Sequence, residues 1–569
     1  MTTDFWQRKT TTIGAYAALG LIALALFAMR LSGPPNLMDN DQERPAAYVR
    51  DVTQNGNWLC QRDATGDITS KPPLYTWLAA LAAITFGRLN LFTLYLPAAL
   101  STLVLAWLIY GIGRAYFGSL AALLAGLVYL LSLVCAKQVA LARTDGLFSL
   151  TVTIAALLAF RAWLRQRGWT WFWVAAAAAT LTKGPLGVLL AVGGLLAVVW
   201  EWRSGRPLFL KGSHLLGITF FLLIAGGWFA LAYREMRTPL INKVIKQELL
   251  RESTSPTRGE PLVKNFYRPC LYFLARFAPW SLFACLGFWR TVKNASVDPG
   301  RRRFERFLFC WFFVGLLIFS LSSHQRGDLL WPLIPAAALC AGRELGRFVE
   351  KRPPAVIVVS TVAATVAIFL GLVFFYQRTE RTNVFVQRTI GIRQFAAAVR
   401  ATAGEEFPLT HVDDPFAFQF YLGPMRRMVS FERAAELLKG DAAAFVVVHD
   451  LAKLKDCLGT SVPTVSELAR WPATGEAFVW IVGNYPRLEW TEHMALLDGS
   501  LRIRVDGARL EHMSEHDLGV RAVGNSSVVT VANESGEPRR IRVRLLQGPL
   551  ETMDERLLTR GETLRVSRQ

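Results

Sequence analysis

Charged residues are concentrated in one long polar segment near the start of the chain, between two apolar stretches. Residues 31–88 carry six carboxylates and several cations, including the motifs DQERP at 41–45 and SKPP at 70–73. A segment that only joins two helices needs a few residues. One that is this long and rich in Asp, Arg, Lys, Trp and Pro is typical of a folded, functional loop. A solvated connector rich in turn formers is the alternative.

Ionisable residues also interrupt or flank later apolar stretches. They are Lys137, Arg143, Asp145, Lys183 within TKGP at 182–185, Arg326, Asp328, and the charged residues of segment 234–270, among them Arg251. Such groups are costly to keep at a membrane edge without partners, so several of them on one side indicate a shared polar site. Snorkelling or interfacial anchoring is the alternative explanation for any single Arg or Lys.

The elements that must position these residues are apolar stretches of about 20 residues, the length that crosses a bilayer core. The chain has 569 residues, of which 52% are hydrophobic. This pattern predicts a polytopic α-helical membrane protein with about eleven transmembrane helices. The expected crossings are 12–30, 89–111, 117–136, 145–163, 170–182, 184–202, 211–233, 271–289, 305–323, 328–346 and 355–376.

Arg and Lys gather in every second connection between these stretches, and Arg8 and Lys9 precede the first one. The positive-inside rule then places the N-terminus in the cytoplasm. The first loop, segment 234–270 and everything after residue 375 are expected outside. Because the net charge of +20 follows this topology, and no basic stripe with interleaved aromatics is present, we do not expect a nucleic-acid partner.

The seven cysteines are scattered, without a CxxC pair or Cys/His ligand spacing. A structural zinc site is therefore not expected, and the sequence indicates neither another metal nor a cofactor. The first apolar stretch lacks a small-residue cleavage site before the polar loop. It is expected to be a retained anchor rather than a cleaved signal.

The composition changes after the last apolar stretch. We expect a transmembrane domain at 1–380, a small α/β domain at 381–489 and a β module at 490–569. The α/β domain is predicted from strands at 409–412, 445–448 and 478–482 and helices at 390–402, 431–439 and 465–470. The β module is predicted from alternating patterns at 501–505, 528–531 and 540–545. Neither part contains a recognisable catalytic constellation.

Six motifs occur in a fixed order: DQERP at 41–45, GNWL at 56–59, SKPPLYTW at 70–77, ARTD at 142–145, LTKGPLG at 181–187 and QRGDLLWPLIPA at 325–336. Together they resemble the polyprenyl-phosphate-dependent glycosyltransferases of the GT-C fold. The nearest branches are the aminoarabinose lipid A transferases and the dolichyl-phosphate-mannose-type protein mannosyltransferases. Some positions depart from the family pattern. Gln42, Pro45 and Ser70 stand where the family has an acid, Tyr and Glu, and Leu329 stands where many members have Tyr.

The resemblance implies transfer of a sugar, with inversion, from a polyprenyl-phosphate-linked donor to lipid A, a cell-surface glycan or a protein. It also implies a bacterial inner-membrane protein whose C-terminal domains lie in the periplasm. The donor phosphate needs cations at the membrane surface, and the acceptor hydroxyl needs a carboxylate base. Asp41 is the first candidate for the base and Asp145 the second. The candidate phosphate ligands are Lys71, Arg44, Arg251 and Lys183, and the candidate sugar or acceptor contacts are Glu43, Arg143, Tyr75, Arg326 and Asp328.

The competing function is a transporter or lipid flippase, which would also have many crossings, ions within the membrane and broken helices such as the one at Lys183. No internal repeat relates the two halves of the chain, and the charges gather at one outer edge rather than at the midplane. A membrane-anchored scaffold is a third alternative, but it leaves the first loop unexplained. The sequence therefore favours the enzyme.

Overall fold

The computed structural model divides the chain into two compact units, Met1–Arg62 with Ile68–Val386, and Asp63–Asp67 with Gln387–Gln569. It describes residues 2–202, 213–244, 265–294, 296–322, 325–403, 409–440, 444–459, 466–473, 476–484, 501–505, 508–509, 528–533, 539–547 and 550–567.

The first unit is helical, as expected of apolar segments whose backbone groups must be satisfied within each segment in lipid. Its helices before the gap at 203–212 are α1 (Thr2–Ser32), η1 (Asp39–Asp41), α2 (Glu43–Asn55), α3 (Leu74–Thr85), α4 (Leu91–Phe117), α5 (Ser119–Leu130), α6 (Leu133–Gln138), α7 (Asp145–Arg165), α8 (Trp169–Lys183), α9 (Leu186–Val192), η2 (Gly193–Leu196) and α10 (Ala197–Trp200). Those after it are α11 (His214–Phe221), η4 (Leu222–Gly226), α12 (Gly227–Met236), α13 (Thr238–Leu240), α15 (Arg268–Arg276), α16 (Trp280–Lys293), α17 (Pro299–Leu321), η8 (Gly327–Leu333), α18 (Ile334–Val349) and α19 (Pro354–Thr382).

Among the described residues, six helices are long and apolar enough to cross a membrane, or seven if α15 and α16 count as one bent span. The six are Thr12–Ser32, Leu91–Phe117, Asp145–Arg165, His214–Met236, Pro299–Leu321 and Pro354–Thr382. The expected eleven crossings are therefore not confirmed. The apolar stretches at 117–136 and 184–202 form short helices, and the stretch at 271–289 is bent by 118° between α15 and α16.

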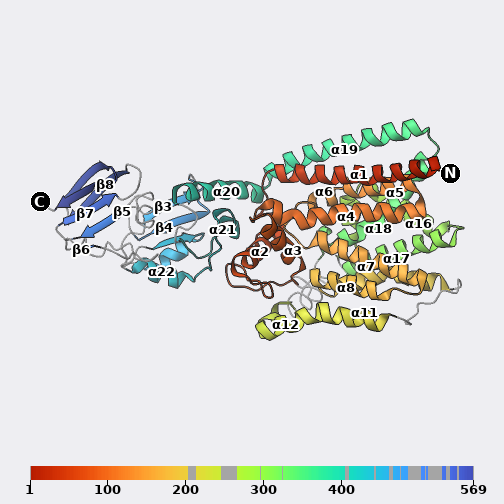
Figure 1. Ribbon diagram of the computed structural model, residues 1–569, viewed down its shortest axis with the longest axis horizontal. Helices are drawn as coiled ribbons and strands as arrows, with labels where there is room; N and C mark the ends of the chain where they lie inside the picture. Colours follow the sequence, from red (N-terminus) through yellow and green to blue (C-terminus); the bar gives the residue numbers. More distant parts are fainter. Residues whose placement is uncertain are drawn as a thin grey trace. The chain divides into compact units, whose positions relative to one another are not determined.

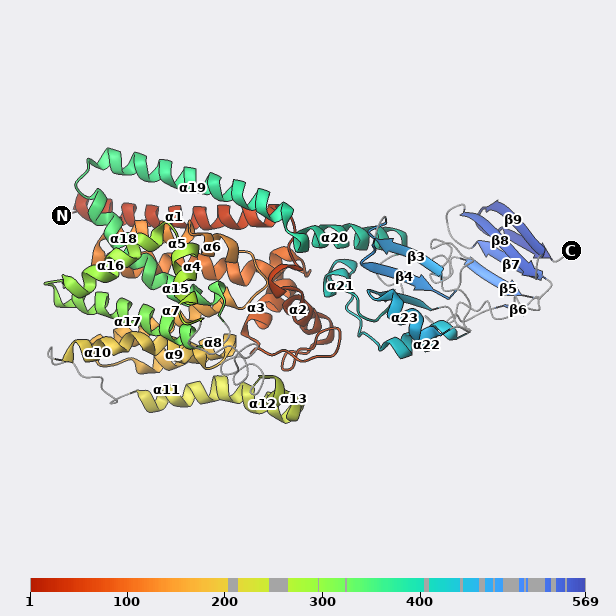
Figure 2. The ribbon, with the colours of Figure 1, turned by 180° about the vertical axis from the view of Figure 1, so that it is seen from behind.

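Helices α1 and α19 lie side by side at one face of the first unit, as Figures 1 and 2 both show. A buried ion pair between Arg30 and Glu380 joins the ends of these two helices. The hydroxyl of Tyr376, on α19, donates to the carbonyl of Leu133 over 3.1 Å. The outer faces of both helices remain apolar and exposed, for example at Leu24, as helices that face lipid require.

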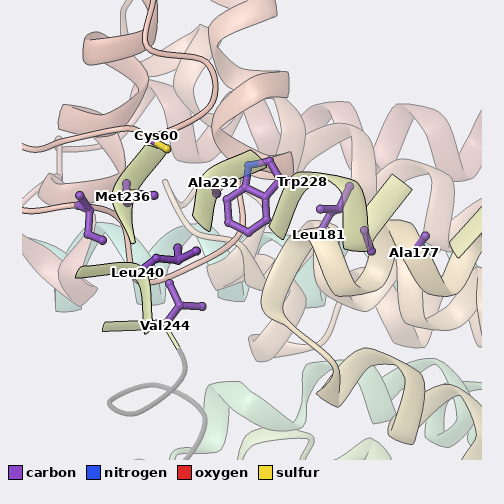
Figure 3. Close-up of a cluster of buried hydrophobic side chains, with 10 residues drawn as sticks. Cys60, Ala177, Leu181, Trp228, Ala232, Met236, Leu240 and Val244 are labelled. Atoms are coloured by element: carbon purple, nitrogen blue, oxygen red, sulfur yellow. The ribbon is translucent and has the colours of Figure 1, made fainter. Parts of the chain in front are cut away.

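The first loop is folded, in agreement with its composition. Its α2 helix buries Asp51, whose carboxylate accepts hydrogen bonds from the side chains of Asn55 and Asn57 and from the backbone of Arg62. The loop also contributes Cys60 and Ile68 to a buried apolar cluster with α8 and α12 (Figure 3). The other members are Ala177, Leu181, Ala225, Trp228, Ala232, Met236, Leu240 and Val244. These contacts fix the loop that carries the proposed chemistry.

The second unit contains an α/β part and a β part. Its helices are α20 (Val384–Ala403, which begins in the first unit), α21 (Phe416–Leu422), α22 (Phe431–Lys439) and α23 (Leu451–Leu458). The first sheet has the order β1 (Leu409–His411), β2 (Phe445–Val448), β4 (Val479–Gly483) and β3 (Ser466–Trp471), in which β1 and β2 are parallel and the other pairs antiparallel. The helix predicted at 465–470 is wrong, because residues 466–471 form β3 and pair with β4.

The β part consists of antiparallel strands, as its alternating pattern predicts. One sheet has the order β10 (Thr563–Ser567), β7 (Val528–Asn533), β5 (Leu501–Val505) and β6 (Ala508–Arg509). The strands β8 (Arg539–Gln547) and β9 (Leu550–Leu558) pair with each other. The tip of the first loop, Asp63–Asp67, also belongs to the second unit, where the carbonyl of Ala64 accepts from the backbone of Met428 over 2.8 Å.

Candidate active site

Six charged side chains of the first unit form one continuous chain of ion pairs. Its links are Asp41 Oδ2 to Arg326 Nη1 at 3.5 Å, Arg326 Nη2 to Asp328 Oδ2 at 3.3 Å, Asp328 Oδ2 to Arg143 Nη1 at 2.5 Å, Arg143 Nε to Asp145 Oδ2 at 3.1 Å, and Asp145 Oδ1 to Lys183 Nζ at 2.5 Å. The structure thus brings together residues that the sequence placed in four separate motifs.

The pair of Asp145 and Lys183 follows from the two consecutive helices that carry it. Asp145 is the first residue of α7 and Lys183 is the last residue of α8. The short connection between these helices makes them antiparallel neighbours, so the start of one meets the end of the other. An acid at a helix N-terminus and a cation at a helix C-terminus also suit the two helix dipoles. Gly184, in the left-handed region with φ 84°, ends α8 directly after Lys183.

Asp328 and Arg143 form the buried middle of the chain of ion pairs. Burial raises the pKa of Asp328, but the charges of Arg143 and Arg326 and the hydrogen bond from Arg143 together outweigh burial, so the pKa lies below its ordinary value. Burial likewise opposes the charge of Arg143, yet Asp145 and Asp328 raise its pKa. Both groups are therefore charged at neutral pH. A buried ion pair of this kind is tolerated because each charge has close partners.

Asp41 is the exposed end of the chain of ion pairs. Its side chain is 83% exposed, and its contact with Arg326, at 3.5 Å, is too long to be a strong hydrogen bond. Its backbone has a φ of +56°, in the left-handed region that residues other than glycine seldom adopt. Such a conformation costs about 1–3 kcal/mol and persists only where the surroundings impose it. The fold therefore holds this carboxylate in a position that faces solvent.

Lys71 lies near the buried end of the chain of ion pairs. It interacts electrostatically with Asp145. Its position is set by a local turn, in which its N–H donates to Thr69 Oγ1 over 3.2 Å and Thr69 Oγ1 donates to its carbonyl over 3.0 Å. Pro72 and Pro73 then lead directly into α3, and their fixed φ angles leave little freedom between Lys71 and that helix.

Two further cations of this region, Lys137 and Arg276, were given no catalytic or binding role from the sequence. Burial lowers the pKa of Lys137, which interacts with Asp39, Arg276 and Asp328. Arg276 lies inside the expected crossing 271–289, but it ends α15 just before the break, and its guanidinium packs against Gly327. An arginine followed three residues later by a proline, within an apolar stretch, was the signal for that break.

The remaining candidates are placed differently. Glu43 and Arg44 lie in the first turn of α2, outside the chain of ion pairs, and Arg44 is exposed. Tyr75 is buried and its hydroxyl donates to the carbonyl of Leu94 over 2.8 Å, so this hydrogen bond serves the packing of α3 against α4. Arg251 lies outside the described residues.

The carboxylates of the site are paired with Lys and Arg rather than gathered into a ligand set. Within the ranges that the structure describes, no three His, Cys, Asp or Glu side chains are grouped so as to hold a metal ion. The arrangement has the form of an anion-binding site with one exposed carboxylate beside it.

Residues 70–228 match the family described as dolichyl-phosphate-mannose-protein mannosyltransferase. An undecaprenyl phosphate-alpha-4-amino-4-deoxy-L-arabinose arabinosyl transferase of Pseudomonas fluorescens is 27% identical over 63% of this chain and 64% of its own length. A second protein of that name, from Proteus mirabilis, is 26% identical over 57% of this chain and 59% of its own length. The chain thus aligns with less than two thirds of the length of these relatives.

A similar fold is found among solved structures. ArnT from Cupriavidus metallidurans, bound to undecaprenyl phosphate, superposes with a TM-score of 0.66 at 19% identity, over 84% of this chain and 99% of that one. Its apo structure gives a TM-score of 0.61 over the same shares of the two chains. The likeness therefore extends beyond the helical region into the C-terminal part of the chain.

Proposed function

The chain is similar in sequence and in fold to the GT-C polyprenyl-phosphate-sugar glycosyltransferases, and we propose that it is itself such an enzyme. It transfers a sugar from a polyprenyl phosphate, of the undecaprenyl class named for its relatives, to a hydroxyl group of lipid A, a cell-surface glycan or a protein. The observation that carries this proposal is the chain of ion pairs that ends at the exposed Asp41.

The charge balance of the site suits a phosphate. Three carboxylates, Asp41, Asp145 and Asp328, stand among four cations, Lys71, Arg143, Lys183 and Arg326. Adding Asp39, Lys137 and Arg276 raises the surplus to two positive charges. An anionic ligand at the membrane surface would compensate this surplus.

Each group of the site is then assigned a role. Asp145 is buried between Arg143 and Lys183, so it holds these cations in place and does not serve as the base. Lys71 and Lys183 face the donor phosphate, and Arg44 and Arg251 remain proposed as further ligands. Arg326 and Asp328, with Glu43, are proposed to contact the sugar or the acceptor. Tyr75 is not retained, because its hydroxyl is engaged with α4.

The reaction is a single displacement. The acceptor oxygen attacks the anomeric carbon while its proton passes to the Asp41 carboxylate. The bond between that carbon and the phosphate oxygen breaks, with inversion, and polyprenyl phosphate leaves with the bonding electrons. The preorganised cations stabilise the negative charge that develops on this phosphate.

We place the site at the periplasmic surface of a bacterial inner membrane. In support, Arg302 and Arg306 lie near the start of α17, where both bind the buried carboxylate of Glu201. Arg326 follows the other end of that helix. The arginine-rich end is the one that the positive-inside rule assigns to the cytoplasm. The second unit follows α19, whose end near Glu380 is joined to the end of α1 that leads into the first loop.

Reconstitution into proteoliposomes tests the proposal against transport. With a radiolabelled undecaprenyl phosphate-linked sugar, the enzyme is expected to release undecaprenyl phosphate and to label an added lipid A or glycan acceptor. The proposal would be contradicted if intact donor moved between the leaflets while the sugar–phosphate bond stayed uncleaved with every acceptor tried. The chain would then be a flippase.

A further inference from the structure

Gln42, between the proposed base Asp41 and Glu43, does not face the site. Its side chain is fully buried, and its three hydrogen bonds all go to backbone groups. Nε2 donates to the carbonyl of Asn36 over 2.8 Å and to that of Asp39 over 2.9 Å. Oε1 accepts from the N–H of Ala142 over 2.8 Å. All three distances are those of ordinary, well-formed hydrogen bonds.

These bonds connect two parts of the active site that are far apart in the sequence. The bonds to Asn36 and Asp39 close the turn that contains Asp41. The bond to Ala142 ties this turn to the segment that continues into Arg143 and Asp145. The amide of Gln42 therefore couples the position of the exposed Asp41 carboxylate to that of the buried Arg143–Asp145 pair.

The backbone of Asp41 gives a second reason why such a tie is needed. Its φ of +56° is unfavourable for a residue with a side chain, so the turn must be held from outside. The carboxylate itself contributes little to this, because it is 83% exposed and its contact with Arg326 is long. The buried neighbour Gln42 provides that support.

We propose that Gln42 is a positioning residue that sets the place of Asp41 relative to the Arg143–Asp145 pair. This inference rests on the proposed function, in which Asp41 acts as the base. Gln42 is buried and bonds to backbone groups, so its loss should slow the chemical step while donor binding at Lys71 is kept. A displacement of about 1 Å is enough to cost on the order of a hundredfold in rate.

Position 42 needs an amide side chain, because its surroundings offer two carbonyl acceptors and one N–H donor. Methionine has a similar length but supplies neither group. An ionised glutamate would direct its oxygens at the two carbonyls, whereas a protonated one could donate to one of them and accept from Ala142. Burial next to carbonyl oxygens raises the pKa of a carboxyl above its ordinary value of about 4.3. In the Gln42→Glu variant, the protonated carboxyl therefore holds the turn at low pH. These hydrogen bonds are lost as the pH rises through the raised pKa of that carboxyl.

The test compares Gln42→Met, Gln42→Glu and the matched control Gln54→Met, an exposed glutamine of the same loop. We expect Gln42→Met to lower kcat roughly ten- to a hundredfold with little change in the donor KM. The control should match wild type. The activity of Gln42→Glu, divided by that of wild type at each pH, should rise from pH 8 to pH 5.5, whereas the ratio for Gln42→Met stays flat.

A second readout does not depend on turnover. The difference in Tm between wild type and Gln42→Glu should shrink over the same pH range, and this measurement remains available if Gln42→Met fails to fold. The positioning role would be overturned if Gln42→Met kept the wild-type kcat. It would also be overturned if the activity ratio and the Tm difference between Gln42→Glu and wild type did not change with pH. Inactivity of wild type and of Gln54→Met together would instead refute the proposed function, and the Tm comparison would still decide whether the amide holds the turn.

Discussion

Lys183 Nζ lies 2.5 Å from Asp145 Oδ1, although 38 positions separate the two residues in the chain. Both side chains are largely buried, and Asp145 also pairs with Arg143. The carboxylate is therefore a fixed counterion between two cations. Under the proposed function, this relationship leaves Asp145 to organise the site and makes the exposed Asp41 the candidate base.

Replacing Asp145 should damage the fold as well as the reaction. Asp145→Asn leaves Arg143 and Lys183 facing a neutral amide in a buried place, and losing one partner of a buried ion pair costs about 3–5 kcal/mol. We expect a clear fall in Tm together with loss of turnover. Adding Lys183→Met to Asp145→Asn should recover part of the lost Tm, because it removes one uncompensated charge. A single Asn variant as stable as wild type would contradict the role of Asp145 as a counterion.

Lys71 should contribute to donor affinity. Lys71→Ala removes a charge-assisted contact to phosphate, which is worth about 1.5–3 kcal/mol, or roughly ten- to a hundredfold in Kd. A binding titration with undecaprenyl phosphate in detergent micelles measures this change. Lys351→Ala, at an exposed position after α18, is the matched control and should bind as wild type does. An unchanged Kd for Lys71→Ala would remove Lys71 from the phosphate site.

The pH dependence of stability should show the depressed pKa of Asp328. Because its folded-state pKa lies below the ordinary value of 3.8, its contribution to stability is present above that value and is lost as the pH falls through the folded pKa. The difference in Tm between wild type and Asp328→Asn should thus be constant from pH 8 to pH 5 and shrink only below about pH 4. A difference that disappeared near pH 6 would mean that Asp328 is not held ionised by Arg143.

Gly327 should control the position of Arg276. A Cβ at Gly327 would lie 2.6 Å from Arg276 Nε, so Gly327→Ala must displace that guanidinium. Because a flexible side chain can move aside, we expect little change in Tm but weaker binding of undecaprenyl phosphate. Gly227→Ala is the matched control, since a Cβ there meets no atom within 4 Å. Equal donor affinity in both variants would place Arg276 outside the phosphate site.

Parts of this site could be predicted from the sequence, because they depend on local order. Asp145 begins one apolar stretch and Lys183 ends the next, so a short connection brings them together without further information. The position of Lys71 could be predicted for a related reason. It stands in the first loop and is followed by two prolines, which fix the backbone where the next helix begins.

Other parts depend on contacts that no local pattern contains. Gln42 reads as a lost acid in the sequence, and its function is visible only from its bonds to Asn36, Asp39 and Ala142. Arg276 was hidden in an apolar stretch that is long enough to cross the membrane but is bent by 118°. Residues 465–470 were predicted as a helix, but residues 466–471 form β3, and pairing with β4 overrides their local pattern.

The most direct measurement of the central claim is single-turnover transfer by Asp41→Asn, with donor affinity measured on the same sample. The substitution keeps the size of the side chain and removes its basicity. If Asp41 is the base, the rate should fall by about 10²–10⁴-fold, while the Kd for undecaprenyl phosphate changes less than about threefold, a difference below 1 kcal/mol. Glu350→Gln, at an exposed acid directly after α18 and outside the chain of ion pairs, should leave both values as in wild type. A transfer rate of Asp41→Asn close to that of wild type would contradict the account.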